Sequence, residues 1–325
     1  MEKINWGIIG CGDVTEIKSG PAFNKVPNSA LVAVMRRNGE KAKDYAQRHN
    51  VPRWYNDASQ LINDPEVNAV YIATPPSSHE EYAIAALNAG KPVYVEKPMA
   101  FNYAAAKRMA IAAAAKNVKL VVAHYRREWP LFKKIKELLN DKAIGDIRLA
   151  RLEFYRPALT KEELAVEKNA WRVDPAVSGG GLFHDLAPHQ LDIMYWLFGD
   201  AEKIDGISSN KAGNYTADDM VSGSISFKNG IVFNGDWCFC ANESIDHCEI
   251  TGSKGKISFS FFGSSDIELV SDGRSFMINL EPLQHVQQPM IEKIVQYFLN
   301  KTSNPCTGEE GAEVMRWMEE FVCRD

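Results

Sequence analysis

The side chain with the clearest potential for chemistry is the amine of Lys97. An apolar run over residues 92–95 leads directly into Glu96, Lys97 and Pro98. The ring of Pro98 restricts the residue before it, so the Lys97 ammonium should project from a well-defined position at a strand end. In an open α/β sheet the carboxyl ends of the strands line the ligand crevice. We therefore expect Lys97 to reach a substrate oxygen; the alternative is a surface lysine paired with Glu96.

A second polar group lies in an apolar segment later in the chain. Asp185, His189 and Asp192 are spaced i, i+4 and i+7, so in a helix they share one face. His189 can exchange protons near neutral pH. Pro188 lacks an N–H, which predicts that the helix begins close to it, with Asp185 in or just before the first turn, where it could instead act as an N-cap. One histidine and two aspartates facing Lys97 are a poor ligand set, so no metal is predicted.

A glycine loop follows the first apolar run of the chain. Gly10, Cys11 and Gly12 lead into Asp13 and Val14, and a threonine replaces the third glycine of the usual motif. Such a loop between strand and helix lets the backbone approach a pyrophosphate. Because it opens a series of βαβ units, we expect Gly10, Gly12, Asp13 and Val14 to bind a dinucleotide; the alternative is a tight turn.

The end of the second strand bears on the choice of nicotinamide cofactor. Enzymes that use NAD commonly carry an acid there, which binds the adenosine ribose, whereas this chain has Arg36 and Arg37. Two guanidiniums could grip a 2′-phosphate, so NADP is favoured and NAD remains possible; the alternative is a pair of solvated arginines. Thr74, Pro75 and His79 follow another strand and are also expected on the ligand edge, although a histidine at a helix start is as often structural.

Length and pattern predict two domains in the 325 residues. Until about residue 122, short apolar runs alternate with helical patterns, as in βαβ units. Later strands are joined by hairpin signals such as Asn229-Gly230. We expect an α/β protein, with a Rossmann domain with a parallel sheet over residues 1–123 and an α+β domain with a large, mostly antiparallel open sheet over residues 124–325. The expected strands are 6–9, 30–35, 69–73, 92–95, 120–122, 146–155, 220–227, 231–237, 248–251, 256–261 and 267–270; the expected helices are 40–49, 78–89, 103–116 and 181–198.

Composition excludes several classes of protein. The hydrophobic and charged fractions, 45% and 24%, are those of a globular domain, and no apolar run is long enough to cross a bilayer. A formal charge of −5 argues against nucleic-acid and anionic-membrane partners. The N-terminus has no pattern of a secretory signal, so a cytoplasmic location is predicted. The six cysteines lack C-x-x-C spacing and are expected to be reduced, with Cys238 and Cys240 on one face of a strand.

Together these motifs resemble the Gfo/Idh/MocA family of oxidoreductases, named for glucose-fructose oxidoreductase and inositol dehydrogenase. The resemblance covers essentially the whole chain and rests, in order, on the glycine loop, Glu96-Lys97-Pro98, Tyr125-Arg126-Arg127, Ala143-Ile144-Gly145, Trp171-Arg172, and Gly179-Gly180-Gly181 leading to Asp185 and His189. It implies a Rossmann domain followed by a domain with a large open sheet that is often buried in a dimer or tetramer interface.

The resemblance also implies roles for particular residues. The family's lysine, aspartate and histidine match Lys97, Asp185 and His189. Trp171 and Arg172 match positions that line the cofactor and substrate cleft. Tyr125 stands where many relatives carry asparagine. Glu96, Lys97 and Arg172 are also expected among the cofactor contacts, and Arg36 resembles the NADP-using branches.

The resulting hypothesis is hydride transfer between nicotinamide C4 and a carbon bearing a hydroxyl or carbonyl on a sugar, sugar derivative or polyol. Lys97 would polarise the substrate oxygen, His189 would act as general acid or base, and Asp185 would orient His189 or bind a neighbouring hydroxyl. Tyr125, Trp171 and Arg172 complete the expected substrate contacts. Two alternatives are a redox-neutral, nicotinamide-dependent glycosidase and a non-catalytic NADP-binding sensor. A homodimer or homotetramer is expected, since one face of the second sheet would need covering.

Overall fold

The computed structural model describes residues 2–322, apart from the side chains of residues 167 and 168. The chain forms two compact units: unit 1 comprises residues 1–125 and 284–315, and unit 2 comprises residues 126–283 and 316–325. The expected division placed everything after residue 123 in the second domain, so residues 124–125 and 284–315 differ from it, and residues 284–315 are the larger difference. They return to unit 1 because Phe298 packs on Trp6, with ring centroids 5.5 Å apart, and the Val122 N–H donates to the Cys306 carbonyl at 3.2 Å.

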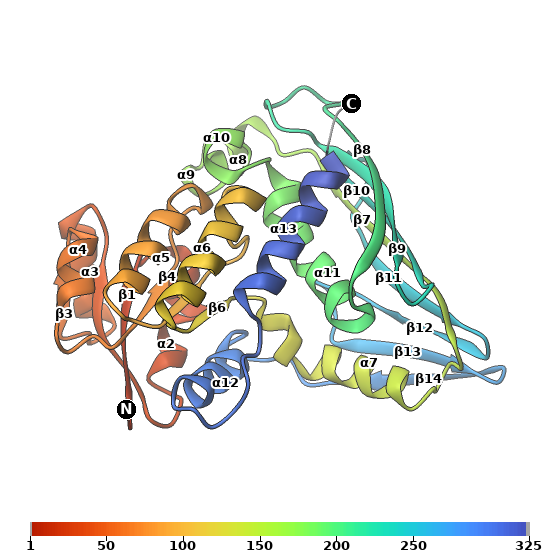
Figure 1. The fold of residues 1–325 in the computed structure, drawn as a ribbon. Helices are drawn as coiled ribbons and strands as arrows, with labels where there is room; N and C mark the ends of the chain where they lie inside the picture. The colour runs from red at the N-terminus through yellow and green to blue at the C-terminus, as the bar shows by residue number, and fades with distance from the viewer. Residues whose placement is uncertain (1, 323–325) are drawn as a thin grey trace. The chain divides into compact units, whose positions relative to one another are not determined.

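Unit 1 is built on a six-stranded parallel sheet with the strand order β3-β2-β1-β4-β5-β6 (Figure 1). This confirms the Rossmann fold expected from the alternating pattern. The sequence reading missed the short strand β3, whose residues are exposed or half-buried and therefore lack an apolar run. The strands span Ile4–Ile9 (β1), Ser29–Met35 (β2), Arg53–Tyr55 (β3), Ala69–Ile72 (β4), Val93–Val95 (β5) and Leu120–Val122 (β6).

The helices of unit 1 start at recognisable caps. Asn38, Asp57 and Asn102 each accept a hydrogen bond from the first turn of the helix that they precede. Gly90, with φ +73°, follows the end of α5, as the sequence indicates. The helices are α1 (Asp13–Ile17), α2 (Gly20–Phe23), α3 (Gly39–Arg48), α4 (Ala58–Asn63), η1 (Pro76–Ser78), α5 (His79–Asn88), α6 (Tyr103–Lys116) and α12 (Gln288–Phe298); α13 (Gly308–Val322) runs from unit 1 into unit 2.

Unit 2 contains an eight-stranded sheet with the order β14-β13-β12-β11-β7-β10-β9-β8. Only the β7–β10 pair of this sheet is parallel, which confirms the expected mostly antiparallel arrangement. The two edge strands, β8 and β14, were missed because most of their residues are exposed or half-buried. The strands are Ile147–Pro157 (β7), Ala201–Ser209 (β8), Met220–Phe227 (β9), Val232–Ala241 (β10), Ile245–Gly252 (β11), Gly255–Phe259 (β12), Asp266–Ser271 (β13) and Arg274–Asn279 (β14).

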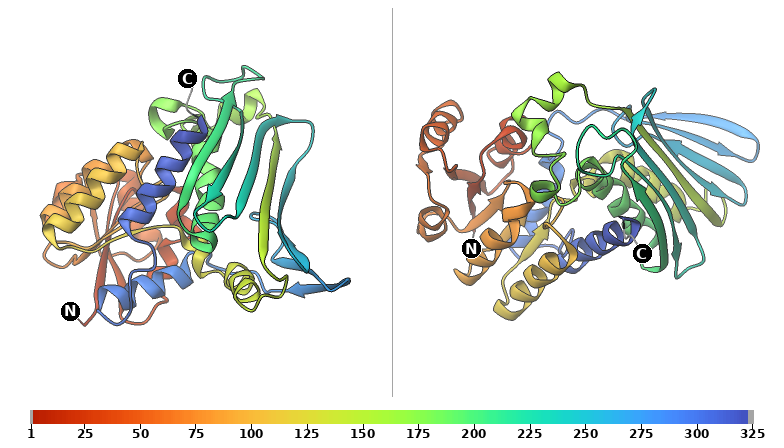
Figure 2. Two further views of the ribbon diagram at one scale, coloured as in Figure 1. Left: turned by 45° about the vertical axis from the view of Figure 1, so that its right-hand side comes forward. Right: turned by 90° about the horizontal axis from the view of Figure 1, so that it is seen from above.

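One face of this sheet carries helices, and α11 and α7 contact β10 and β13 (Figure 1). Trp237 of β10 joins α11 to the sheet, since its indole donates to Gln190 Oε1 at 2.8 Å and its ring meets Phe183 edge to face. No helix among residues 2–322 covers the opposite face (Figure 2). The helices of this unit are η2 (Tyr125–Glu128), α7 (Pro130–Asn140), α8 (Lys161–Leu164), α9 (Glu167–Ala170), α10 (Pro175–Ser178) and α11 (Leu182–Phe198).

The start of α11 confirms the expected helix over residues 181–198, with Asp185 in the first turn. Pro188 lies inside the helix, which begins six residues earlier at Leu182, and Gly181 holds the N-cap position. Asp185 therefore lies in the first turn and is not the N-cap. The backbone that leads into α11 passes through the left-handed region at Gly179 and Gly181, whose φ values are +91° and +81° and which glycine adopts readily. A Cβ atom at Gly180 would lie only 2.1 Å from the His184 ring.

Candidate functional site

The carboxyl edge of the unit 1 sheet brings three predicted segments together. Strand β4 pairs with β1 through Ile72 and Ile9, and with β5 through Ile72 and Val95. The residues that follow these strand ends are the glycine loop, the Thr74-Pro75 segment and Glu96-Lys97-Pro98. In a parallel sheet these ends lie side by side on the ligand-binding edge. The lysine at the strand end is thus placed next to the expected dinucleotide loop.

The two glycines of the loop have different structural roles. Gly10 has φ +94°, and a Cβ atom there would lie 2.7 Å from the Thr74 methyl carbon, so a side chain is excluded. A Cβ atom at Gly12 would meet only the Gly10 carbonyl oxygen, at 4.0 Å. The open space beside Gly12 fits the close approach of a pyrophosphate to the backbone.

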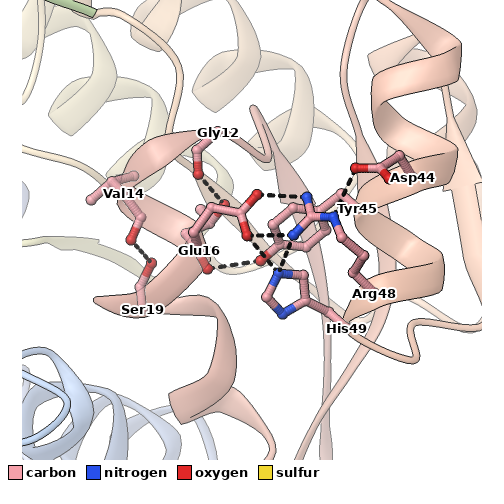
Figure 3. Close-up of polar contacts among 9 residues, drawn as sticks. Gly12, Val14, Glu16, Ser19, Asp44, Tyr45, Arg48 and His49 are labelled. Carbon is pink, nitrogen blue, oxygen red and sulfur yellow. Dashed lines mark hydrogen bonds and ion pairs between the residues drawn. The ribbon is translucent and has the colours of Figure 1, made fainter.

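Side chains from α1 and α3 hold the loop in place (Figure 3). The Thr15 hydroxyl donates to the Gly12 carbonyl at 2.8 Å, and the Tyr45 hydroxyl donates to the Thr15 carbonyl, also at 2.8 Å. Thr15 is fully buried and Tyr45 almost so. The threonine that replaces the third glycine therefore ties the first turn of α1 back to the loop, and α3 supports this turn.

An ion-pair cluster reinforces the same contact between α1 and α3. Glu16 accepts two hydrogen bonds from Arg48, each at 2.8 Å, and lies 2.8 Å from His49 Nε2 (Figure 3). Arg48 also donates to Asp44 at 2.8 Å. The hydrogen bonds from Arg48 are the largest cause that lowers the Glu16 pKa from 4.5 to about 2, with His49 contributing further.

This cluster predicts an acid-dependent effect of Glu16→Gln. The folded-state pKa of Glu16 is lowered, so its stabilising contribution is complete above a pH of about 4.5 and is lost as the pH falls toward about 2. At pH 7 the variant should be less stable by about 1 kcal/mol, the upper value for an exposed pair. Thermal unfolding measured from pH 7 down to pH 3 should show this difference shrinking below pH ~4.5. The exposed Glu40→Gln is the control, and a difference that does not depend on pH would contradict the assignment.

The end of β2 presents basic side chains, as expected. Arg36 is half-buried, and Arg37 and Asn38 are exposed. The Arg36 N–H donates to the Tyr55 carbonyl at 3.2 Å, which fixes its backbone against β3. Asn38 is occupied as the cap of α3, with its side chain accepting from the Lys41 N–H at 3.0 Å. The strand tip thus offers guanidinium groups where NAD enzymes commonly have a carboxylate.

Glu96 and His79, two expected cofactor contacts, make internal hydrogen bonds in unit 1. The Glu96 carboxylate is 6% exposed and accepts from Gln287 Nε2 at 2.6 Å and from the Tyr71 hydroxyl. His79 is fully buried, with Nε2 2.7 Å from the Thr74 carbonyl and Nδ1 3.0 Å from the Pro98 carbonyl. Burial lowers the His79 pKa to about 4, and a neutral ring has one N–H for these two carbonyls. Sequence reasoning missed Gln287, because nothing in its local pattern distinguishes it.

In unit 2, α11 presents Asp185 and His189 as the spacing predicts. Arg172 Nε donates to Asp185 Oδ2 at 3.1 Å, so two predicted site residues are brought together. The Arg172 guanidinium also lies over the Trp171 ring, 4.7 Å from its centroid. The His189 ring is 5% exposed and meets the Phe262 ring edge to face at 5.6 Å.

Arg126 and Arg127 of the Tyr125-Arg126-Arg127 segment make buried contacts within unit 2. The Arg126 guanidinium lies between the rings of Trp129 and Phe262, at 4.2 and 4.4 Å from their centroids. Arg127 forms a buried ion pair with Asp192, with Nη2 2.7 Å from Oδ1 and side-chain exposures of 2% and 1%. Asp192, the third polar residue on this face of α11, thus has a structural partner. Tyr125 is buried at the end of unit 1.

The two groups of predicted residues belong to different units. Lys97 lies in unit 1, and Asp185, His189 and Arg172 lie in unit 2. Their joint action on one substrate therefore stays a prediction. Among the side chains that the structure describes, which exclude those of residues 167 and 168, no three of His, Cys, Asp or Glu are grouped as metal ligands. Cys238 and Cys240 lie on one face of β10, with their sulfur atoms 3.7 Å apart, as predicted, whereas Cys323 lies outside the described residues.

None of the helices within residues 2–322 combines the length and the apolar character needed to cross a membrane.

Two family models match this chain, one in unit 1 and one in unit 2. Residues 4–124 match the family model described as oxidoreductase family, NAD-binding Rossmann fold, and residues 132–258 match that of the GFO/IDH/MocA C-terminal domain. Among solved structures, levoglucosan dehydrogenase in complex with NADH and levoglucosan has a TM-score of 0.87 at 23% identity, covering 98% of this chain and 96% of that one. The similarity to the structure of levoglucosan dehydrogenase shows that the two proteins share a fold.

Curated relatives extend the match over nearly the whole chain. "Oxidoreductase P35" of Formosa agariphila is 50% identical over 319 residues, which cover 98% of each protein. A trans-1,2-dihydrobenzene-1,2-diol dehydrogenase of Mus musculus is 31% identical over 260 residues, covering 78% of this chain and 73% of the relative. The chain therefore belongs to the Gfo/Idh/MocA family of oxidoreductases, and its first unit has that family's NAD-binding Rossmann fold.

Proposed function

We propose that this oxidoreductase transfers a hydride between nicotinamide C4 and a hydroxyl- or carbonyl-bearing carbon of a sugar, sugar derivative or polyol, with NADP as the favoured cofactor. The observation that carries this proposal is the placement of Lys97 directly beyond β5, on the sheet edge shared with the glycine loop. A cation at this edge suits an oxygen that gains negative charge when hydride arrives at a carbonyl carbon or, in the reverse direction, when the hydroxyl loses its proton before hydride leaves. The cofactor itself supplies the hydride chemistry when bound.

The residues of α11 supply the proton chemistry in this proposal. His189 would donate or accept the proton of the substrate oxygen, and Asp185 would orient His189 or hold a neighbouring hydroxyl. Arg172 donates to Asp185 at 3.1 Å, which keeps that carboxylate in place. Trp171, Arg172 and Tyr125 would complete the substrate contacts. The names of the relatives, a dihydrodiol dehydrogenase and levoglucosan dehydrogenase, support a small hydroxylated ring as substrate.

Cofactor preference is tested by titration of the purified protein with NADPH and with NADH, following quenching of tryptophan fluorescence. The half-buried Arg36 is expected to bind the 2′-phosphate, so Arg36→Asp should weaken NADPH binding by about tenfold or more and leave NADH nearly unchanged. Lys43→Asp, an equal charge change at an exposed position of α3, is the control. Binding of NADH as tight as that of NADPH by the unaltered protein would contradict the NADP assignment.

The reaction is tested by following cofactor absorbance at neutral pH with levoglucosan, trans-dihydrobenzenediol, aldoses, ketoses and polyols, in both directions. Net oxidation or reduction of one of these compounds is expected. Hydrolysis of a glycoside without net absorbance change would favour the redox-neutral glycosidase. A cofactor that copurifies and is displaced by neither nucleotide, with no turnover, would favour the sensor.

A homodimer or homotetramer that covers the open face of the unit 2 sheet is part of the proposal. Leu149, Val232 and Ile207 are exposed on this sheet, and the first two are direct cross-strand partners on β7 and β10. Apolar side chains in this position favour association. Light scattering that gives the mass of a single chain would contradict it. A cytoplasmic location is kept as a prediction as well.

A further inference from the structure

We propose that Gln287, together with Tyr71, is a positioning residue that holds Glu96 and thereby fixes the backbone from which Lys97 projects. This inference rests on the proposed function, in which Lys97 contacts the substrate oxygen. All four residues belong to unit 1, and Gln287 comes from the segment that returns to it after unit 2.

The contacts form a branched set of hydrogen bonds that meets at the Glu96 carboxylate, next to Lys97. Gln287 Nε2 donates to Glu96 Oε1 at 2.6 Å, and the Tyr71 hydroxyl donates to the same oxygen. The Lys97 N–H donates to the other carboxylate oxygen, Oε2, at 3.2 Å. The Tyr94 hydroxyl in turn donates to Gln287 Oε1 at 3.0 Å, so both ends of the Gln287 amide are used.

The residues of this hydrogen-bond network are buried, so the Glu96 carboxylate depends on protein donors instead of water. Tyr71, Tyr94 and Gln287 are fully buried, and Glu96 is 6% exposed. A carboxylate out of water depends on its donors, and removal of either donor leaves Glu96 Oε1 with one hydrogen bond fewer in a buried position. Burial also raises the pKa of Tyr71 and Tyr94 well above the usual value, so both hydroxyls remain donors. The Glu96 side chain is therefore held in one orientation, and its second oxygen can serve the Lys97 amide.

Gln287 is itself rigidly placed. It occupies the N-cap position of α12, where its carbonyl accepts from the Ile291 N–H at 2.9 Å. The Tyr71 and Tyr94 rings stack at 4.9 Å on neighbouring strands, which fixes their hydroxyls. On the other side of Lys97, His79 lies 3.0 Å from the Pro98 carbonyl and 3.3 Å from that of Met99. The segment is thus held before and after the lysine.

The test compares Gln287→Leu and Tyr71→Phe, each of which removes a donor to Glu96 while nearly keeping side-chain volume. The first readout needs no substrate: hydrogen–deuterium exchange of the Lys97 amide in the protein with saturating NADPH. We expect exchange at least about tenfold faster in both variants, because the acceptor of this N–H is no longer held. The second readout is kcat in the hydride-transfer assay, which should fall about tenfold while cofactor binding changes less than about twofold.

Asn304→Leu is the matched control from the same returning segment. The Asn304 amide donates to the Leu120 carbonyl at 2.9 Å and accepts from the Cys306 N–H at 3.1 Å, away from Glu96. This variant should lower thermal stability and leave both readouts unchanged. Unchanged exchange of the Lys97 amide in both test variants would overturn the inference, as would an equal loss of kcat in Asn304→Leu. If Lys97→Met were fully active, the proposed function would fail instead, whatever the exchange data show.

Discussion

Lys97→Met is expected to lower kcat by at least about 10³-fold, the loss typical of removing a group that both positions and polarises a reacting oxygen. Methionine keeps the length and the apolar stem of the side chain but carries no charge and no N–H donor. The glycine loop and the end of β2, which are expected to bind the nucleotide, are untouched. Cofactor affinity, measured by tryptophan quenching, should therefore change by no more than about twofold.

The control for this prediction is Lys116→Met, which removes an exposed lysine at the end of α6 in the same unit. It should behave like the unaltered protein in both assays. Substantial turnover by Lys97→Met would remove the lysine from the mechanism. A parallel loss of cofactor binding would instead assign Lys97 to the nucleotide site.

Asp192→Ala is expected to produce the largest loss of stability. Asp192 and Arg127 are almost completely buried, and their contacts include Nε–Oδ2 at 3.0 Å and Nη2–Oδ1 at 2.7 Å. Removal of the carboxylate leaves the guanidinium without its charge partner, which costs about 3–5 kcal/mol. For a unit of this size the thermal midpoint of unfolding should fall by roughly 10 °C. Because α11 also carries Asp185 and His189, kcat should fall as well.

Two further variants separate the buried charge from a general effect of removing an aspartate. Asp205→Ala breaks the exposed Lys203–Asp205 pair and should change stability by less than about 1 kcal/mol. The double variant Arg127→Met/Asp192→Leu replaces the pair by apolar side chains and should recover most of the lost stability. If Asp192→Ala had no more effect than Asp205→Ala, the pair would not organise α11.

Much of the site was accessible from the sequence because it depends on local pattern. Apolar runs that end in Gly10, Arg36, Thr74 and Lys97 predict strands whose carboxyl ends meet at one edge, since parallel strands share a direction. The i, i+4 spacing likewise predicts that Asp185 and His189 share a helix face. In both cases backbone geometry converts sequence spacing directly into proximity, and α11 and the unit 1 sheet confirm it.

Other features were set by partners far away in the chain. The sequence placed Asp192 on a polar helix face but did not identify Arg127, 65 residues earlier, as its partner. The edge strands β8 and β14 contain no buried residue, so their sequences show no alternation of buried and exposed positions. The structure adds the reason why glycines precede α11, since a Cβ atom at Gly180 would lie 2.1 Å from the His184 ring and one at Gly181 would lie 2.4 Å from the Ala217 Cβ.

By itself, the sequence indicated the family through the resemblance of its motifs. It also predicted the two-part α/β architecture and the positions of the glycine loop, Lys97, Asp185 and His189, because these depend on short-range periodicity and strand ends. Only the tertiary structure decided that residues 284–315 return to unit 1, and that Gln287 donates to Glu96 across 191 residues. The physical reason is that a buried carboxylate must find its donors wherever packing brings them, and this need leaves no regular mark on the local sequence.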